Sequence, residues 1–179
     1  MKAPPTHILS TPRLLLRRWA DSDVEPFAHM NRDPEVMRHF PRLYTAEESA
    51  AMVARAEACF DQHGYGLFAL ELKATGEFIG YTGFAKPGFE SWFTPCTEIG
   101  WRLKKGAWGK GYATEAASAC LDYGFQQLGM EKVFSWTALS NTPSERVMQR
   151  IGMTRLGEFD HPRIEAGHPL RRHVLYVRD

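Results

Sequence analysis

The chain has 179 residues, of which 44% are hydrophobic and 24% charged, and its net charge is +1. This composition is typical of one soluble globular domain, so a single domain over residues 1–179 is expected. The near-zero charge argues against a nucleic-acid partner. No apolar run is long enough to span a membrane or to form a signal-peptide core, which argues against a membrane partner and favours a cytoplasmic location.

The first half of the chain predicts one strand, three helices and a hairpin. Capping-box spacing marks the start of the longest helix at Thr45, and Gly64 stops this helix. Gly76 supplies the turn between two short apolar runs, which is the pattern of a hairpin. In chain order, the expected elements are a strand at residues 13–18, a helix through residues 27–30, a short helix at residues 34–37, the capped helix, and hairpin strands at residues 67–70 and 78–81.

The second half of the chain predicts a loop followed by alternating strands and helices. The loop at residues 85–96 carries three aromatic residues that either line a ligand pocket or pack on the sheet: Phe89, Trp92 and Phe93. Residues 97–103 alternate as a strand does, and Gly100 within them indicates a bulge or a ligand close to the backbone. The remaining elements are a helix at residues 112–128 capped by Gly129, a strand at 132–137, a short helix at 143–150, and a hairpin from Met153 with its second arm at 172–177.

The most informative stretch runs from Trp108 to Ala116 and reads Trp-Gly-Lys-Gly-Tyr-Ala-Thr-Glu-Ala. Its two glycines precede an Ala-rich helix. The unpaired N–H groups and the positive dipole end of a helix start attract anions, and glycines let a bulky phosphate approach. The Walker spacing is absent, and the dinucleotide fingerprint lacks its third glycine, at Thr114. The stretch therefore predicts a phosphate cradle, with a plain helix-starting turn as the alternative.

Cysteine and histidine positions predict no metal site. Cys59, Cys96 and Cys120 are far apart and odd in number, which indicates reduced thiols. The seven histidines include no pair with metal-ligand spacing.

Four pieces of the chain carry a family resemblance: residues 9–17 (Leu-Ser-Thr-Pro-Arg-Leu-Leu-Leu-Arg), residues 98–101 (Glu-Ile-Gly-Trp), the cradle stretch, and residues 141–144 followed by 150–153 (Asn-Thr-Pro-Ser and Arg-Ile-Gly-Met). In this order they resemble the GNAT N-acetyltransferase superfamily, and most closely its Rim-type branch, which acetylates ribosomal-protein N-termini. The resemblance implies an α+β fold with a mixed, mostly antiparallel sheet of six to seven strands flanked by helices. In that fold the fourth and fifth strands run parallel and splay apart.

The resemblance also implies acetyl-CoA as co-substrate and the residues that bind it. Pantetheine would slot between the splayed strands and pair with backbone groups of Trp101, Arg102 and Leu103. The pyrophosphate would be held by backbone amides of Gly109, Lys110, Gly111, Tyr112, Ala113 and Thr114, after Trp108 at the start of the loop. Asn141 and Ser144 would hydrogen-bond the cofactor arm. The Lys110 side chain either adds charge to the phosphates or is simply solvated.

Two positions depart from the family pattern. Trp108 stands where the superfamily often has Gln or Arg, which the Rim-type branch commonly tolerates. Met148 stands where many members have a tyrosine that protonates the departing thiolate, and a methionine has no proton to give. The acid is then Ser144, a water molecule, or absent, since a thiol with a pKa of about 8.5 leaves tolerably as thiolate.

Glu98 is the candidate catalytic base, because an amine must lose a proton before it attacks and Glu98 lies on the strand that would hold the thioester. It acts directly or through a water molecule. The alternative is an exposed carboxylate, or one paired with Arg102. Backbone N–H groups near Trp101 to Leu103 would stabilise the oxyanion.

The acceptor amine stays open between two classes. A peptide N-terminus is favoured, and a small amine such as a polyamine, antibiotic or amino acid is the alternative, with Glu47, Glu48 and Glu90 as carboxylates that could receive a polyamine. A non-catalytic acyl-CoA-binding module is a third hypothesis. The resemblance is compatible with a monomer or a homodimer.

Overall fold

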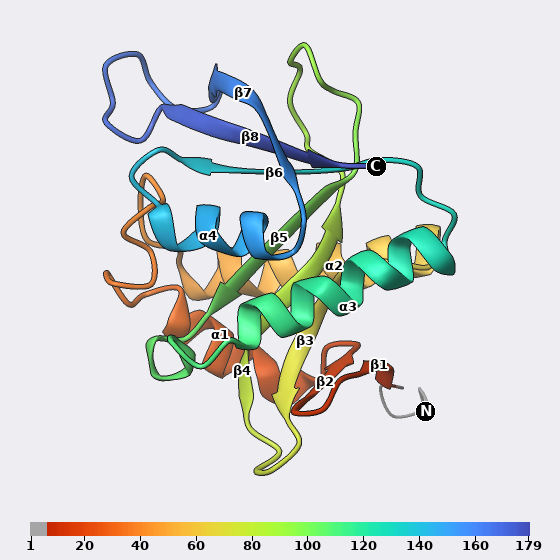
Figure 1. Cartoon of the computed structure of the whole chain (residues 1–179). Coiled ribbons are helices and arrows are strands. Elements are labelled where there is room, and N and C mark those ends of the chain that lie inside the picture. Colours follow the sequence, from red (N-terminus) through yellow and green to blue (C-terminus); the bar gives the residue numbers. More distant parts are fainter. Residues whose placement is uncertain (1–6) are drawn as a thin grey trace.

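The computed structural model describes residues 7–179, which form one eight-stranded sheet flanked by helices (Figure 1). The strand order is β1-β2-β3-β4-β5-β6-β8-β7. Neighbouring strands are antiparallel except β5 and β6, which are parallel. The strands are β1 (His7–Ser10), β2 (Leu14–Arg17), β3 (Leu67–Leu72), β4 (Phe78–Ala85), β5 (Glu98–Leu103), β6 (Val133–Ala138), β7 (Thr154–Asp160) and β8 (Arg172–Arg178). Residues 1–6 of the predicted domain lie outside the described residues.

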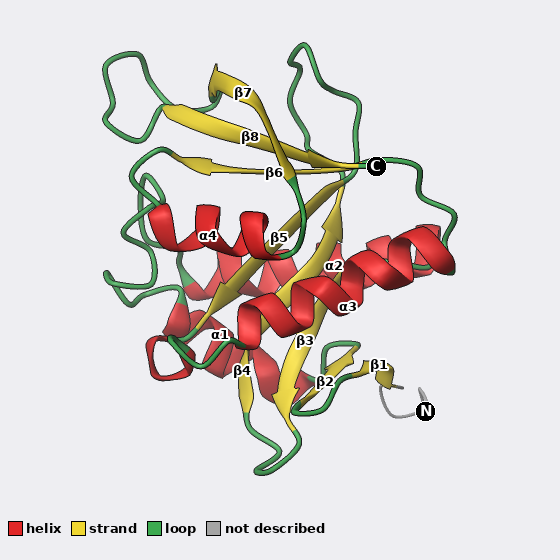
Figure 2. Cartoon of the chain, in the orientation of Figure 1, coloured by secondary structure: helices red, strands yellow, loops and turns green. Residues whose placement is uncertain are grey.

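The helices follow the expected order (Figure 2). They are α1 (Val24–Met30), α2 (Ala46–His63), α3 (Tyr112–Gln126) and α4 (Thr142–Arg150), with short 3₁₀ turns η1 (Asp21–Asp23) and η2 (Lys105–Ala107). The capping box is confirmed, because the Thr45 hydroxyl accepts from the Glu48 N–H and the Glu48 carboxylate accepts from the Thr45 N–H. Gly64 ends α2 in the left-handed conformation, at φ +74°. No helix in residues 7–179 is long and apolar enough to cross a membrane.

Two predicted features were wrong. The sheet has eight strands rather than six to seven, because β1 folds back on β2 across a turn in which the Thr11 N–H donates to the Leu14 carbonyl (2.9 Å). The helix expected at residues 34–37 is a series of turns. The bond from Met37 N–H to the Asp33 carbonyl (3.0 Å) is followed by a shorter-range bond from Phe40 to Met37, so no continuous helix forms.

Helices lie on both faces of the sheet (Figure 1), and an apolar cluster packs beneath them on each face. On one face α3 and α4 pack with Ala117, Leu121 and Met148 against Ile99 and neighbouring strand residues. On the other face α1 and α2 form a second cluster that includes Phe27, Val53 and Tyr81. The small residues Ala116, Ala117 and Cys120 of α3 are fully buried, which lets this helix lie close to the strands that carry the site.

The splay between β5 and β6 is present. The two strands share a single register pair, Glu98 with Phe134, whereas β5 pairs with β4 along its whole length. Two hydrogen bonds of 2.9 Å connect the strands at this join: the Phe134 N–H donates to the Thr97 carbonyl, and the Ser135 hydroxyl donates to the Ile99 carbonyl. Beyond it, the stretch of β5 from Gly100 to Leu103 has no strand partner on the β6 side.

Candidate functional site

Strand β5 presents different chemistry on its two faces. Ile99 and Leu103 are buried in the cluster under α3. Because side chains alternate along a strand, Glu98, Gly100 and Arg102 share the opposite face, toward α1 and the segment that joins it to α2. The polar groups of β5 are thereby separated from its packing face.

Glu98 is the first residue of β5 and lies where β5 and β6 part. Its side chain is half-buried, and burial raises the pKa of its carboxyl from 4.5 to about 8. The same environment acts on Cys96, where burial and then the nearby Glu98 charge raise the pKa of the thiol to about 11. A carboxyl with a pKa close to working pH can both take up and release a proton. This is the property expected of a general base, whereas an exposed carboxylate would show no such shift.

The suggested ion pair between Glu98 and Arg102 is wrong. The Arg102 Nη1 donates to Oδ1 of Asn31 (2.6 Å), and within residues 7–179 no carboxylate lies within ion-pair distance of its guanidinium. The guanidinium carbon lies 4.0 Å from the ring centroid of Phe40 and 5.3 Å from that of Tyr44. Arg102 is 6% exposed, so its side chain fixes the segment between α1 and α2 against β5.

The glycine stretch forms the expected turn before α3. Gly109 and Gly111 have φ values of +73° and +81°, the left-handed region that favours glycine, and Gly111 is the N-cap of the helix. No side chain caps the helix start, so its first N–H groups stay available to an anion. A Cβ atom on Gly109 would meet nothing within 4 Å, which shows that the turn is open on this side.

The Trp108 side chain connects the turn to β5. Its indole Nε1 donates to the Leu103 carbonyl (2.9 Å), and its ring is 38% exposed. The carbonyl of Leu103, at the end of β5, therefore lies beside Trp108, at the start of the glycine stretch. Binding of pantetheine by the backbone of Trp101, Arg102 and Leu103, and of pyrophosphate by the stretch from Trp108 to Thr114, stays a prediction.

Asn141 and Ser144 lie together at the start of α4. The Asn141 Oδ1 accepts from the Ser144 N–H (3.4 Å) and its Nδ2 donates to the Thr137 hydroxyl (2.8 Å), so this side chain caps the helix and ties it to β6. Met148, one helical turn further on, is 1% exposed and belongs to the core. Its packing gives it a structural role and leaves no acid at this position.

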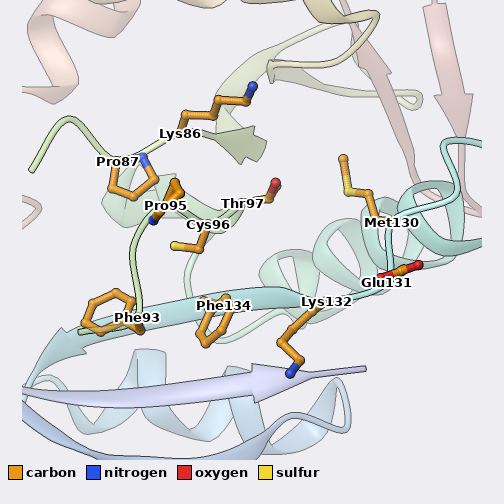
Figure 3. A pocket seen from close by; sticks show the side chains of 10 residues that line it. All are labelled: Lys86, Pro87, Phe93, Pro95, Cys96, Thr97, Met130, Glu131, Lys132 and Phe134. Atoms are coloured by element: carbon orange, nitrogen blue, oxygen red, sulfur yellow. The ribbon is translucent and has the colours of Figure 1, made fainter. Parts of the chain in front are cut away.

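A hollow of about 690 Å³ lies at the closed end of the β5–β6 join (Figure 3). Its lining includes Cys96 and Thr97 before β5, Phe134 of β6, and Met130 beyond α3. Because α3 has 15 residues, this end is about 22 Å from the glycine turn. The hollow is therefore separate from the predicted cradle.

The loop before β5 packs on the sheet. Phe89 and Phe93 contact the rings of Trp136 and Phe159, with centroid separations of 4.8–6.4 Å, while Trp92 is 65% exposed. Packing on the sheet is thus confirmed for Phe89 and Phe93, and Phe93 also lines the hollow of Figure 3. Within residues 7–179, no group of three or more His, Cys, Asp or Glu side chains is placed to hold a metal ion.

Comparison with known proteins identifies the family. The model of the acetyltransferase (GNAT) domain matches residues 13–154. The chain belongs to the GNAT acetyltransferase family. The uncharacterized N-acetyltransferase YnaD of Bacillus subtilis is 32% identical, over 84% of this chain and 85% of its own. The FsC-acetyl coenzyme A-N(2)-transacetylase of Aspergillus fumigatus is 34% identical, over 89% of this chain and 69% of its own.

Solved structures of GNAT proteins share the fold. A GNAT-family acetyltransferase from Bacillus anthracis superposes with a TM-score of 0.78 at 29% identity, covering 94% of this chain and 96% of its own. The ribosomal L7/L12 α-N-protein acetyltransferase RimL also has a TM-score of 0.78, covering 97% of this chain and 94% of its own. At 15% identity RimL shows the fold alone, so membership of the Rim-type branch stays a prediction.

The sequence did not predict two residues that contact the candidate site, Arg13 and Asn31. Arg13, just before β2, contacts the glycine turn at Lys110, and Asn31 holds Arg102. Both partners are more than 70 residues away in the chain, so no local spacing could pair them. The only signal for Arg13 was its place in the matching piece at residues 9–17.

Proposed function

We propose that this acyltransferase moves an acetyl group from acetyl-CoA to a primary amine by direct attack in a ternary complex, and that the α-amine of a protein N-terminus is the favoured acceptor. One observation carries the proposal. The half-buried Glu98 lies where β5 and β6 part, and the unpaired stretch of β5 leads from it toward the glycine turn before α3.

The residues around this stretch fit CoA. Open backbone at Gly109 and a helix N-terminus without a side-chain cap suit a diphosphate. The N–H groups of residues 109–114 would hold that diphosphate, and the Lys110 side chain is exposed beside them. Backbone groups of Trp101, Arg102 and Leu103 would pair with the pantetheine amides, and Asn141 and Ser144 would meet the same arm from α4. Bound there, acetyl-CoA supplies the activated acetyl group.

Glu98 would take the proton from the attacking amine. A protein α-amine has a pKa of about 7.7–8.0, close to the value of about 8 for the Glu98 carboxyl. Transfer between two groups of similar pKa costs little free energy in either direction. A lysine side chain, with a pKa of about 10.4, gives up its proton far less readily. This match supports an α-amine acceptor over a lysine side chain.

The other two steps are stabilisation of the oxyanion and departure of the thiolate. A backbone N–H near Trp101 to Leu103 would stabilise the oxyanion. Because the buried Met148 has no proton to donate, we assign the Ser144 hydroxyl as a hydrogen-bond donor to the leaving thiolate, which takes its proton from water. A thiol with a pKa of about 8.5 needs limited help to leave, so the contribution of Ser144 is smaller than that of Glu98.

A small amine is the second candidate acceptor, favoured by the 34% identity to a relative that is named for acetyl transfer to an N(2) nitrogen, the FsC-acetyl coenzyme A-N(2)-transacetylase. A polyamine is less well supported. Glu48 is held by Arg42 in an ion pair and by the Thr45 N–H, so it is not free to receive an ammonium group.

The test measures CoA thiol release from acetyl-CoA with a panel of acceptors: peptides that begin with Ser, Ala or Met, spermidine, an aminoglycoside and free amino acids. Release that requires the peptides supports the proposal, and release with one of the small amines only selects the alternative. Glu98→Gln should lower kcat by about 10²–10⁴ with little change in acetyl-CoA affinity. Glu165→Gln, at an exposed loop carboxylate, is the matched control.

A further inference from the structure

Arg13 connects the first turn of the chain to the start of α3. Its backbone N–H donates to Oε1 of Glu115 (2.9 Å) and its Nε donates to Oε2 of the same carboxylate (2.6 Å). Its Nη1 donates to the Lys110 carbonyl (2.8 Å), inside the glycine turn. The guanidinium carbon lies 4.5 Å from the ring centroid of Tyr112. Four contacts thus fix one arginine against the predicted cradle.

The Glu115 carboxylate orders this arrangement from the first turn of α3. In addition to the two bonds from Arg13, it accepts a hydrogen bond from the Thr11 hydroxyl (2.6 Å). Burial opposes ionisation of this carboxyl, but the hydrogen bonds from Thr11 and Arg13 outweigh it and lower its pKa. Glu115 is therefore charged at neutral pH, and it holds the guanidinium in one orientation.

One nitrogen of the guanidinium remains without a partner. Among residues 7–179, Nη2 of Arg13 has no hydrogen-bond acceptor, and the side chain is 47% exposed. A Cβ atom built on Gly111 would lie 3.4 Å from this Nη2. The free donor is thus beside the N-cap of α3, where the motif and the family place the diphosphate.

We propose that Arg13 is a further binding residue for the diphosphate of CoA, with Nη2 as the donor and Nε and Nη1 as the anchored side of the fork. The inference rests on the proposed use of the glycine turn as the CoA cradle. A guanidinium is suited to this task, because it stays charged and can bond a carboxylate on one edge and a phosphate on another. Its bond to the Lys110 carbonyl also keeps the turn in the shape that exposes the backbone N–H groups.

The test compares Arg13→Gln with the wild type in calorimetric titrations of CoA and of dephospho-CoA, which lacks the 3′-phosphate but keeps the diphosphate. Arg13→Gln should weaken both ligands by about ten- to hundredfold. Arg13→Lys should recover part of this loss, because the charge remains. Arg155→Gln is the matched control, since Arg155 is 48% exposed and paired with Glu158 on β7, and it should leave both affinities unchanged.

A second measurement separates a phosphate contact from a structural role. Arg13→Gln should lower kcat/KM for acetyl-CoA and leave it unchanged for S-acetylpantetheine, which has no phosphate. An equal loss with both donors, or an unchanged CoA affinity with a lower Tm, would show that Arg13 only stabilises the turn. A loss of affinity for CoA but not for dephospho-CoA would show that Arg13 contacts the 3′-phosphate, and it would overturn the diphosphate assignment. A wild type that binds neither CoA nor dephospho-CoA would overturn the proposed function itself.

Discussion

Replacing Glu98 with Gln should make the protein more stable at high pH while it lowers activity. Burial raises the pKa of this carboxyl from 4.5 to about 8 in the folded chain. A group whose pKa is raised on folding contributes full stability below its unfolded pKa and loses that contribution as pH rises through the folded value. Wild-type stability should therefore decline between pH 4.5 and about pH 8 on account of Glu98, and Glu98→Gln should not show this part of the decline.

The pKa shift sets an upper bound on the effect. At 1.36 kcal/mol per pKa unit, a rise from 4.5 to about 8 corresponds to about 5 kcal/mol above pH 8 and about 3 kcal/mol at pH 7. The side chain keeps some contact with solvent, which screens the charge, so a difference of about 2 kcal/mol at pH 9 is expected. Near pH 4.5 the wild type and the variant should be equally stable.

Urea unfolding of the wild type, Glu98→Gln and the control Glu165→Gln at pH 5, 7 and 9 measures this difference. Parallel stability curves for the wild type and Glu98→Gln would refute the burial argument. The pH profile of kcat/KM is a second readout, which should rise toward about pH 8 in the wild type and lose that inflection in Glu98→Gln. Since the acceptor amine titrates in the same range, the profile should be repeated with an acceptor of different pKa. An inflection that moves with the acceptor belongs to the amine.

Three other variants and one control test the remaining parts of the site. Gly111→Leu should weaken CoA binding at least tenfold, because it puts a side chain at φ +81° beside Arg13. Its control is Gly64→Ala, at φ +74° in open space, which should lower stability and leave the Kd for CoA unchanged. Asn31→Ala should cost about 2 kcal/mol in urea unfolding, because it removes the one hydrogen bond of the buried Arg102 guanidinium; a cost below about 0.5 kcal/mol would contradict that role. Met148→Leu should leave kcat within twofold and change stability by less than about 1.5 kcal/mol, and a large loss of kcat would show that this position contributes to catalysis beyond packing.

Local signals predicted the parts of the structure that depend on adjacent residues. The capping box at Thr45 and the glycine turn before α3 need only short-range geometry, and both are present. Strand β1 was missed because its four residues pair with a strand just across a tight turn, and nothing in their pattern marks a separate element. The series of turns after Asp33 was misread because a single helical turn and a short helix have the same residue preferences.

The properties of the site residues depend on contacts between distant parts of the chain and could not be predicted from the sequence. The position of Glu98 on a strand was predicted, but its raised pKa depends on how the surrounding chain excludes water from the carboxyl. The Arg13 contacts with the start of α3 join residues about 100 positions apart. Neither property leaves a spacing pattern in the sequence. Local sequence patterns supplied the order of the elements and the family resemblance supplied the cofactor, whereas the charges and donors at the site depend on contacts in the folded chain.

The pKa of Glu98 depends on its distance from Arg102, the other ionisable side chain on the polar face of β5. Glu98 and Arg102 are four residues apart, which places their Cα atoms about 13 Å apart in a strand. A guanidinium in contact with Glu98 would favour the charged carboxylate and lower its pKa, so the group would no longer be poised near the pKa of an α-amine. Arg102 is instead held by the neutral amide of Asn31 and by the rings of Phe40 and Tyr44. Because its partners carry no charge, Arg102 can fix the segment between α1 and α2 while burial alone sets the pKa of Glu98.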